Sequence, residues 1–185
     1  MGLDLKNLDD RTRELMADEI GKDIEAKNVY LSGRLTPEGE IRWIDLLLEA
    51  VNDHDDDWLA SQLTRLSLIR DFETRRKPTG GTTQARIPAN APDTLAQGEF
   101  NRYYIRALCR YAIDVGLDSV VVYRARHSSS PRRESEELIG KKLAPGVVLN
   151  DLRSAVGVDT ALGVPPGPNS GLSVCLETSR SDELA

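Results

Sequence analysis

Residues 98–116 read GEFNRYYIRALCRYAIDVG, and this stretch predicts a long helix from Glu99 to about Val115 that ends at Gly116. Its large apolar residues recur at helical spacing and form one face: Phe100, Tyr104, Leu108, Tyr111 and Val115. The sequence DSVVVYRAR at 118–126 follows and predicts a strand. Because its three valines run without polar alternation, we expect this strand to be buried on both faces, in the middle of a sheet.

Three shorter amphipathic helices are predicted upstream. The first begins at a cap formed by Asp9 or Asp10, the second has Thr36 as its N-cap and Pro37 at its first position, and the third begins near Asp56. The expected apolar stripes are Met16, Ile20 and Ile24 in the first helix; Ile41, Ile44, Leu48 and Val51 in the second, flanked by Trp43 and Leu47; and Trp58, Leu59, Leu63 and Leu66 in the third.

Residues 74–98 have a different character, with three prolines, three glycines and little periodicity. They predict a long loop or extended arm, with a short strand at 85–87 as its one regular element. Compact domains rarely contain loops of this length without a purpose. An arm that reaches a neighbouring subunit, a mobile lid and simple disorder are the three interpretations.

The downstream part predicts a short helical turn near Ser135, a helix over 145–155 and a last strand over 172–177. The fold class is therefore α/β or α+β, with a sheet of two to four strands behind helices. The expected parts are a helical segment at 1–73, the arm at 74–98, an α/β segment at 99–177 and a tail at 178–185, within one domain overall.

Composition excludes several classes of protein. The chain has 185 residues, a net charge of −6 and two cysteines, Cys109 and Cys175, which are too few for a disulfide-rich secreted scaffold. No apolar run is long enough for a transmembrane helix, so no membrane partner is expected. The first ten residues carry acids where a signal peptide needs bases, which favours a cytoplasmic protein.

Motifs for catalysis are weak. His54 next to Asp55 suggests a metal phosphohydrolase, but the second histidine, His127, lies in a downstream loop, and a helix N-terminus explains the aspartates better. Gly80-Gly81 lacks the lysine of a P-loop. The serines at 128–130 have no base that is visibly held against them. We therefore predict no catalytic residue, no metal and no cofactor.

Charge is distributed unevenly along the chain. Residues 1–57 contain 16 acids and 7 bases, whereas residues 99–133 contain 7 arginines and 3 acids. These arginines either pair internally with the acidic helices, contact another copy or another protein, or contact nucleic-acid phosphates. The candidate interface residues are Arg102, Arg106 and Arg110, which form one ridge of the long helix, together with Arg124, Arg126, Arg132 and Arg133.

Three stretches resemble a family of small proteins from the structural gene modules of tailed bacteriophages and prophages: APDTLAQGEFNRYYIRALCRYAI, VVVYRARHSSSPRRESEELIG and VDTALGVPPGPNSGLSV. The resemblance covers roughly residues 5–176. It implies a virion structural protein, capsid-associated or a head–tail connector, that assembles as an oligomer in the host cytoplasm. Its partners would be other virion proteins or copies of itself, and no catalytic residue carries over.

Two other functions stay open at this point. A cytosolic module that binds nucleic acid or a regulatory partner would also suit the unequal charges, although the acidic chain does not favour nucleic acid. A hydrolase that uses His54 or His127 is the third possibility, and it requires a pocket that contains one of these histidines.

Overall fold

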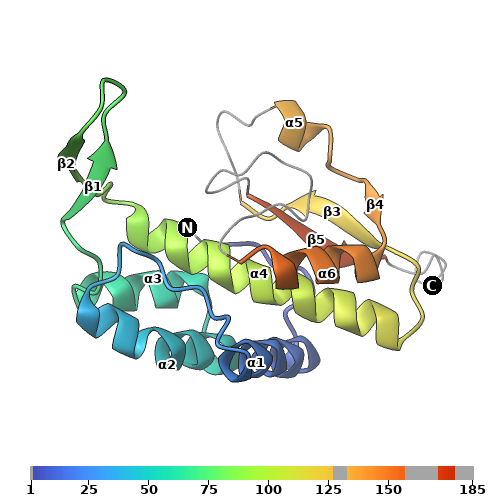
Figure 1. Cartoon of the computed structure of the whole chain (residues 1–185). Helices are drawn as coiled ribbons and strands as arrows, with labels where there is room; N and C mark the ends of the chain where they lie inside the picture. The colour runs from blue at the N-terminus through green and yellow to red at the C-terminus, as the bar shows by residue number, and fades with distance from the viewer. Residues whose placement is uncertain (1, 127–132, 157–170, 178–185) are drawn as a thin grey trace.

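The computed structural model describes residues 2–126, 133–156 and 171–177, and within them it has an α+β fold (Figure 1). The helices are α1 (Asp10–Glu25), α2 (Pro37–Asp53), α3 (Asp56–Arg65), α4 (Ala91–Asp114), α5 (Arg133–Glu136) and α6 (Pro145–Ser154). The strands are β1 (Phe72–Arg76), β2 (Thr82–Arg86), β3 (Val120–Arg124), β4 (Lys142–Leu143) and β5 (Leu172–Leu176).

Side-chain caps start the first three helices where the sequence predicts them. Asp9 accepts a hydrogen bond from the amide of Thr12 at 2.8 Å, and Thr36 accepts one from Gly39 at 3.1 Å. Asp55 caps α3 in the same way. Each cap satisfies an amide that has no partner within its helix, which fixes the first turn.

The buried side of α2 differs from the predicted stripe. Trp43, Leu47 and Ala50 are fully buried, whereas Ile41, which the spacing placed on the apolar stripe, is 75% exposed. The prediction failed because α2 carries apolar residues around most of its circumference, so spacing alone selects no unique face. The bulk of Trp43 decides which side packs against the core.

Residues 74–98 are not an irregular loop, which corrects the prediction. β1 and β2 form an antiparallel hairpin in which Phe72 pairs with Arg86 and Arg76 with Thr82. Residues 91–98 belong to α4, which begins at Ala91, eight residues before the predicted start at Glu99. The predicted extension does occur, since the hairpin projects from one end of the molecule (Figure 1).

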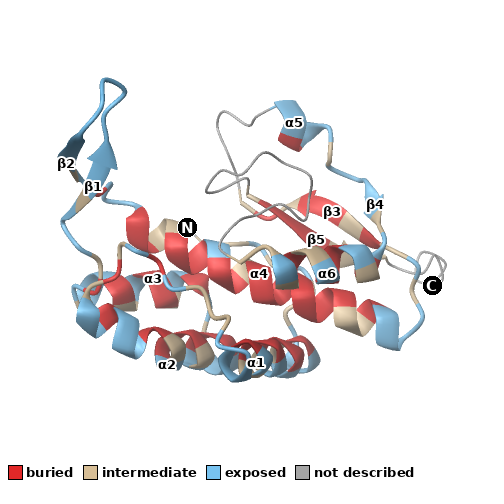
Figure 2. Cartoon of the chain, in the orientation of Figure 1, coloured by how far each residue is buried: buried red, intermediate tan, exposed pale blue. Residues whose placement is uncertain are grey.

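Helix α4 runs through the centre of the molecule. It packs against α1 and α3 on one side and against α6 and β5 on the other, and 16 of its 24 residues are buried. Figure 2 shows this burial along nearly its whole length. A helix that is buried all round needs few polar side chains, so the arginines that α4 does carry require partners inside the protein.

A small antiparallel sheet covers one side of α4. Its strand order is β4-β3-β5, so β3 lies in the middle, as its valine run predicts. Val120 pairs with Leu143 on one side and with Leu176 on the other. Core residues from α1 to β5 form one continuous apolar cluster, so the predicted helical and α/β parts share one core.

Candidate interaction surface

The ridge of α4 arginines faces the interior of the protein. Arg106 is 1% exposed, donates a hydrogen bond of 2.9 Å to Glu19 and one of 2.5 Å to Asp23, and lies over the ring of Tyr103. Glu19 and Asp23 both belong to α1. The first of the three interpretations, internal pairing with the acidic helices, therefore describes Arg106.

Glu19 is the centre of this charge network. Its side chain is fully buried and contacts four cations: Lys22, Arg106, Arg110 and Arg153. Burial by itself raises the pKa of Glu19, but hydrogen bonds from Arg153, Lys22 and Arg106 outweigh burial and lower this pKa to about 2. The network ties α1, α4 and α6 together.

The two other ridge residues are also engaged within the chain. Arg102 is 7% exposed and donates to the carbonyl oxygens of Leu152 and Ala155 at 3.1 and 2.9 Å, where it satisfies the C-terminal end of α6. Arg110 pairs with Asp18 at 3.4 Å as well as with Glu19. The ridge is thus a structural element of the monomer rather than an accessible interface.

The remaining predicted interface arginines lie apart from the ridge. Arg124 pairs with Glu136, Arg126 donates to the Oε1 of Gln97 at 2.5 Å, and Arg133 pairs with Glu137 at 2.9 Å. Arg132 lies outside the described residues. Of the seven predicted residues, Arg133 on α5 is well exposed, with 88% of its side chain accessible.

Glu99 is a second buried carboxyl group on α4. It is 5% exposed, and the Nε of Arg102 lies 3.5 Å from its Oε1. Burial raises the pKa of Glu99 to about 7 in spite of the nearby arginines. The pKa values of Glu99 and Glu19 therefore shift in opposite directions, because Glu19 has more charged hydrogen-bond donors that outweigh the effect of burial.

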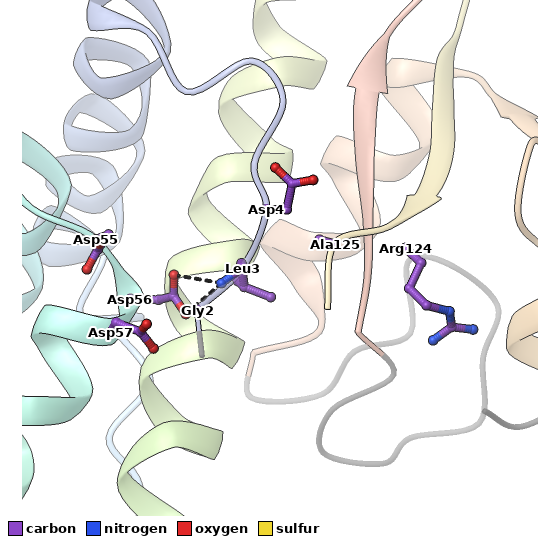
Figure 3. Close-up of a pocket in the computed structure, with 8 residues that line it drawn as sticks. All are labelled: Gly2, Leu3, Asp4, Asp55, Asp56, Asp57, Arg124 and Ala125. Atoms are coloured by element: carbon purple, nitrogen blue, oxygen red, sulfur yellow. Dashed lines mark hydrogen bonds between the residues drawn. The ribbon is translucent and has the colours of Figure 1, made fainter. Parts of the chain in front are cut away.

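An open pocket of about 550 Å³ lies between the N-terminal segment, the start of α3 and the end of β3 (Figure 3). Asp55 and Asp56 line one side, and Arg124 comes from the other. Asp56 accepts the amide of Leu3 through both carboxylate oxygens, at 3.1 and 3.2 Å, and Asp55 caps α3. Asp55 thus caps its own helix, as the helix-N-terminus interpretation predicts, whereas Asp56 holds the backbone of the N-terminal segment, which that interpretation did not predict.

His54 does not belong to the described residues that line this pocket. The ring of His54 stacks on the ring of Trp58, with centroids 4.2 Å apart, and His127 lies outside the described residues. Within the described part of the chain, no group of three or more histidine, cysteine or acidic side chains is arranged to hold a metal ion. Cys109 is buried, and burial raises the pKa of its thiol to about 12, so the thiolate does not form near neutral pH.

The β1–β2 hairpin is the most exposed regular element, as Figure 2 shows. Its tip is a tight turn in which Pro78 follows Lys77 and the amide of Gly80 donates to the carbonyl of Lys77 at 3.1 Å. Gly80 and Gly81 have φ values of +90° and +79°, in the left-handed region that glycine adopts without strain.

The base of the hairpin is firmly attached to the body. Arg34, in the link between α1 and α2, binds Glu73 through two hydrogen bonds of 2.8 and 3.2 Å. Ile87 is buried, and its amide donates to the carbonyl of Asp71 at 2.8 Å. Arg70 pairs with Glu40 of α2 at 3.6 Å. These contacts hold the arm in a defined direction.

Charge on the hairpin is opposite to that of the chain. Phe72–Arg86 contains four basic residues and one acidic residue, a net charge of +3. The whole chain carries −6, so the remainder carries −9. In the part of the chain that the structure describes, the side chains of Arg76, Lys77 and Arg86 have no ion pair or hydrogen bond, and all three are exposed.

These hairpin cations are not among the interface candidates predicted from the sequence. The signal was present, since FETRR and TTQAR flank the five-residue turn Lys-Pro-Thr-Gly-Gly, which is a hairpin pattern. The many prolines and glycines of 74–98 hid it, because they also suit an irregular loop. The structure therefore moves the candidate surface from the arginines of α4 to those of the hairpin.

Comparisons with known proteins add no family to this description. No protein-family model, curated protein or solved structure matches the chain. In the described residues, none of the helices combines the length and apolar character that crossing a bilayer would require.

Proposed function

We propose that this protein is a structural assembly protein, a component of a tailed-bacteriophage particle as the resemblance implies, and that it joins its neighbours through the β1–β2 hairpin. The observation that carries this proposal is the hairpin itself. It is anchored at its base, exposed over the rest of its length and opposite in charge to the body.

An exposed two-stranded hairpin is marginally stable on its own, so a partner surface would add to its stability. Along its described residues, neither β1 nor β2 has a second strand neighbour. Open strand edges accept another chain through backbone hydrogen bonds, and the charged side chains then select the partner. Assembly proteins need arms of this kind, because copies must be joined across gaps between compact bodies.

Sedimentation of the native particle tests the proposal. In a lysate of the source cells, the chain is expected in a fraction far heavier than the monomer. Replacing Phe72–Arg86 with a short glycine-serine linker should shift it to the monomer fraction while circular dichroism of the purified variant shows a folded body. A wild-type chain that sediments only as a free monomer would contradict the proposal.

Nucleic-acid binding is the second candidate, and the exposed cations of the hairpin favour it. Phosphate binding of this kind weakens steeply with salt, by orders of magnitude over a few-fold change in salt for a site with many contacts. The body, with its charge of −9, opposes it by repelling phosphates. Titration of a labelled DNA duplex at two salt concentrations separates this candidate from protein assembly.

A further inference from the structure

We propose that the hairpin binds the outer face of α2 on a second copy of this chain. The inference rests on the proposed function and names the partner of the same arm. Three observations carry it: the residues on one face of the hairpin, the residues on the outer face of α2, and the agreement between their spacings.

One face of the hairpin carries no acidic residue. In an antiparallel pair, directly opposed residues point to the same face, so the register defines this face as Phe72, Thr74, Arg76, Thr82, Gln84 and Arg86. Gln84 donates to the hydroxyl of Thr74 at 3.1 Å, as neighbours on one face should. All six residues are exposed, including Phe72 at 57%. A single large apolar side chain thus lies between cations.

The outer face of α2 is complementary to this surface. Ile41 is the most exposed of the large apolar residues that the structure describes, at 75%, and Asp45 and Glu49 follow it at successive four-residue steps, both exposed. Among the described residues, Asp45 has no side-chain partner, and the contact of Glu49 is with His54 at 4.0 Å. The hairpin face, with its phenylalanine and two arginines, would bind a surface that has an apolar side chain beside carboxylates. The outer face of α2 is such a surface.

The spacings of the two faces agree. Phe72 and Arg76 are four residues apart on a strand, which is about 13 Å at ~3.3 Å per residue. Ile41 and Glu49 are eight residues apart on a helix, which is about 12 Å at ~1.5 Å per residue. Placing Phe72 on Ile41 therefore brings Arg76 to Glu49. Arg86, directly opposite Phe72, then reaches Asp45 one turn along.

The contact must form between copies. Within one chain Phe72 and Ile41 are both largely exposed, so they do not cover each other. Each copy carries both surfaces, so the contact repeats, either as a closed two-fold pair or from copy to copy around a ring. The body that would repel nucleic acid is the same acidic surface that attracts the hairpin.

A charge-reversal experiment on the purified chain tests this proposal. The hairpin variant is Arg76→Glu with Arg86→Glu, and the α2 variant is Asp45→Arg with Glu49→Arg. Wild type is expected to self-associate in sedimentation velocity at low salt. Each variant alone should weaken association by about tenfold or more, and an equimolar mixture should restore it, because the hairpin of one then matches the helix of the other.

The controls use equally exposed positions. Arg133→Glu changes an exposed arginine on α5 and should leave association unchanged. Ile41→Ser should weaken association without lowering the thermal midpoint, because this side chain contributes little to the core. Circular dichroism confirms that every variant is folded.

Three outcomes would overturn the inference. Wild type that stays monomeric at every concentration would do so, as would a mixture of the two variants that does not associate. The third outcome concerns the hairpin variant, Arg76→Glu with Arg86→Glu. If it no longer binds a DNA duplex but self-associates as wild type does, the hairpin binds nucleic acid rather than α2. If the wild-type chain is monomeric alone but sediments with the native particle, the inference fails and the proposed function stands with a different partner.

Discussion

Arg106 of α4 donates a hydrogen bond of 2.9 Å to Glu19 of α1, and both side chains are almost completely buried. Asp23, one turn further along α1, accepts hydrogen bonds from Arg106 and from the hydroxyl of Tyr103. The contact between α1 and the central helix thus depends on charge as well as on apolar packing. Buried charges are stable only as a set, because removing one leaves the others without compensation.

Arg106→Met should therefore destabilise the monomer strongly. The variant leaves Glu19 and Asp23 buried beside fewer cations, and we expect a loss of about 3–5 kcal/mol in the free energy of unfolding. Urea denaturation followed by circular dichroism measures it. Arg133→Met is the matched control and should change stability by less than about 0.5 kcal/mol, since its side chain is exposed. Equal stability of the two variants would contradict the expectation.

The burial of Arg106 also determines what Arg106→Glu would do. If the ridge were an interface, as one interpretation of the sequence holds, Arg106→Glu would abolish assembly and leave the monomer folded. With Arg106 at 1% exposure between two carboxylates, we now expect Arg106→Glu to unfold the monomer itself. Loss of assembly in that variant would therefore carry no information about an interface.

Glu99 should make the protein less stable as pH rises toward neutrality. Its pKa in the folded protein is about 7, against 4.5 for a free glutamate, so the folded state retains a proton that the unfolded state has released. This contribution to stability is fully present below about pH 4.5 and is lost as pH rises through 7. Glu99→Gln should raise the free energy of unfolding at pH 8, by about 1–3 kcal/mol, and change it little near pH 5. Glu14→Gln, at an exposed site of α1, should show no such pH dependence.

Glu19 should make the protein less stable as pH falls, which is the opposite of the pH dependence expected from Glu99. Its pKa is about 2 in the folded protein, so its contribution to stability is present above about pH 4.5 and is lost as pH falls toward 2. Glu19→Gln should therefore be markedly less stable than wild type at pH 7, with a difference that shrinks on acidification. Thermal unfolding at pH 7, 4 and 2.5 measures this difference. A difference that grew as pH fell would refute the assigned role of Glu19.

Gly39 in the first turn of α2 should not accept a side chain. A methyl group there would lie 2.5 Å from the carbonyl oxygen of Leu68, which is backbone and has little freedom to move. Gly39→Ala should lower stability by about 1–3 kcal/mol through this overlap. Gly21→Ala in α1 is the control: a methyl group there meets nothing within 4 Å and should stabilise the helix by about 0.5–1 kcal/mol. If chemical denaturation showed that both variants change the free energy of unfolding in the same direction, this prediction would be wrong.

Local signals predicted the parts of the fold that local chemistry determines. The caps at Asp9, Thr36 and Asp55, the end of α4 before Gly116 and the central place of β3 each depend on a few adjacent residues. The hairpin was missed because its strands are polar on both faces and carry no burial pattern. A strand that packs against nothing lacks the alternation by which strands are recognised.

The candidate interaction surface was harder to predict, because tertiary contacts decide which charged side chains are exposed. The spacing of Arg102, Arg106 and Arg110 predicts one ridge on the helix. The partners of Arg106 and Arg110, however, belong to α1 and lie more than 80 residues away in the sequence. Nothing in the periodicity distinguishes an arginine that faces solvent from one that faces another helix. Arg76, Lys77 and Arg86 of the hairpin, by contrast, are interface candidates because no other described residue pairs with their side chains.

The two apolar residues Trp43 and Ile41 of α2 offer the sharpest check on the orientation of that helix. Trp43 is fully buried, so Trp43→Ala should cost about 3–5 kcal/mol in the free energy of unfolding. Ile41→Ala should cost less than about 0.5 kcal/mol, because three quarters of the side chain is already in water. The stripe expected from spacing alone would give Ile41 the larger effect. Urea denaturation of the two variants at low protein concentration, where self-association does not contribute, separates these alternatives. A large loss of unfolding free energy in Ile41→Ala would mean that Ile41 faces the core. The outer face on which the proposed contact depends would then not exist as described.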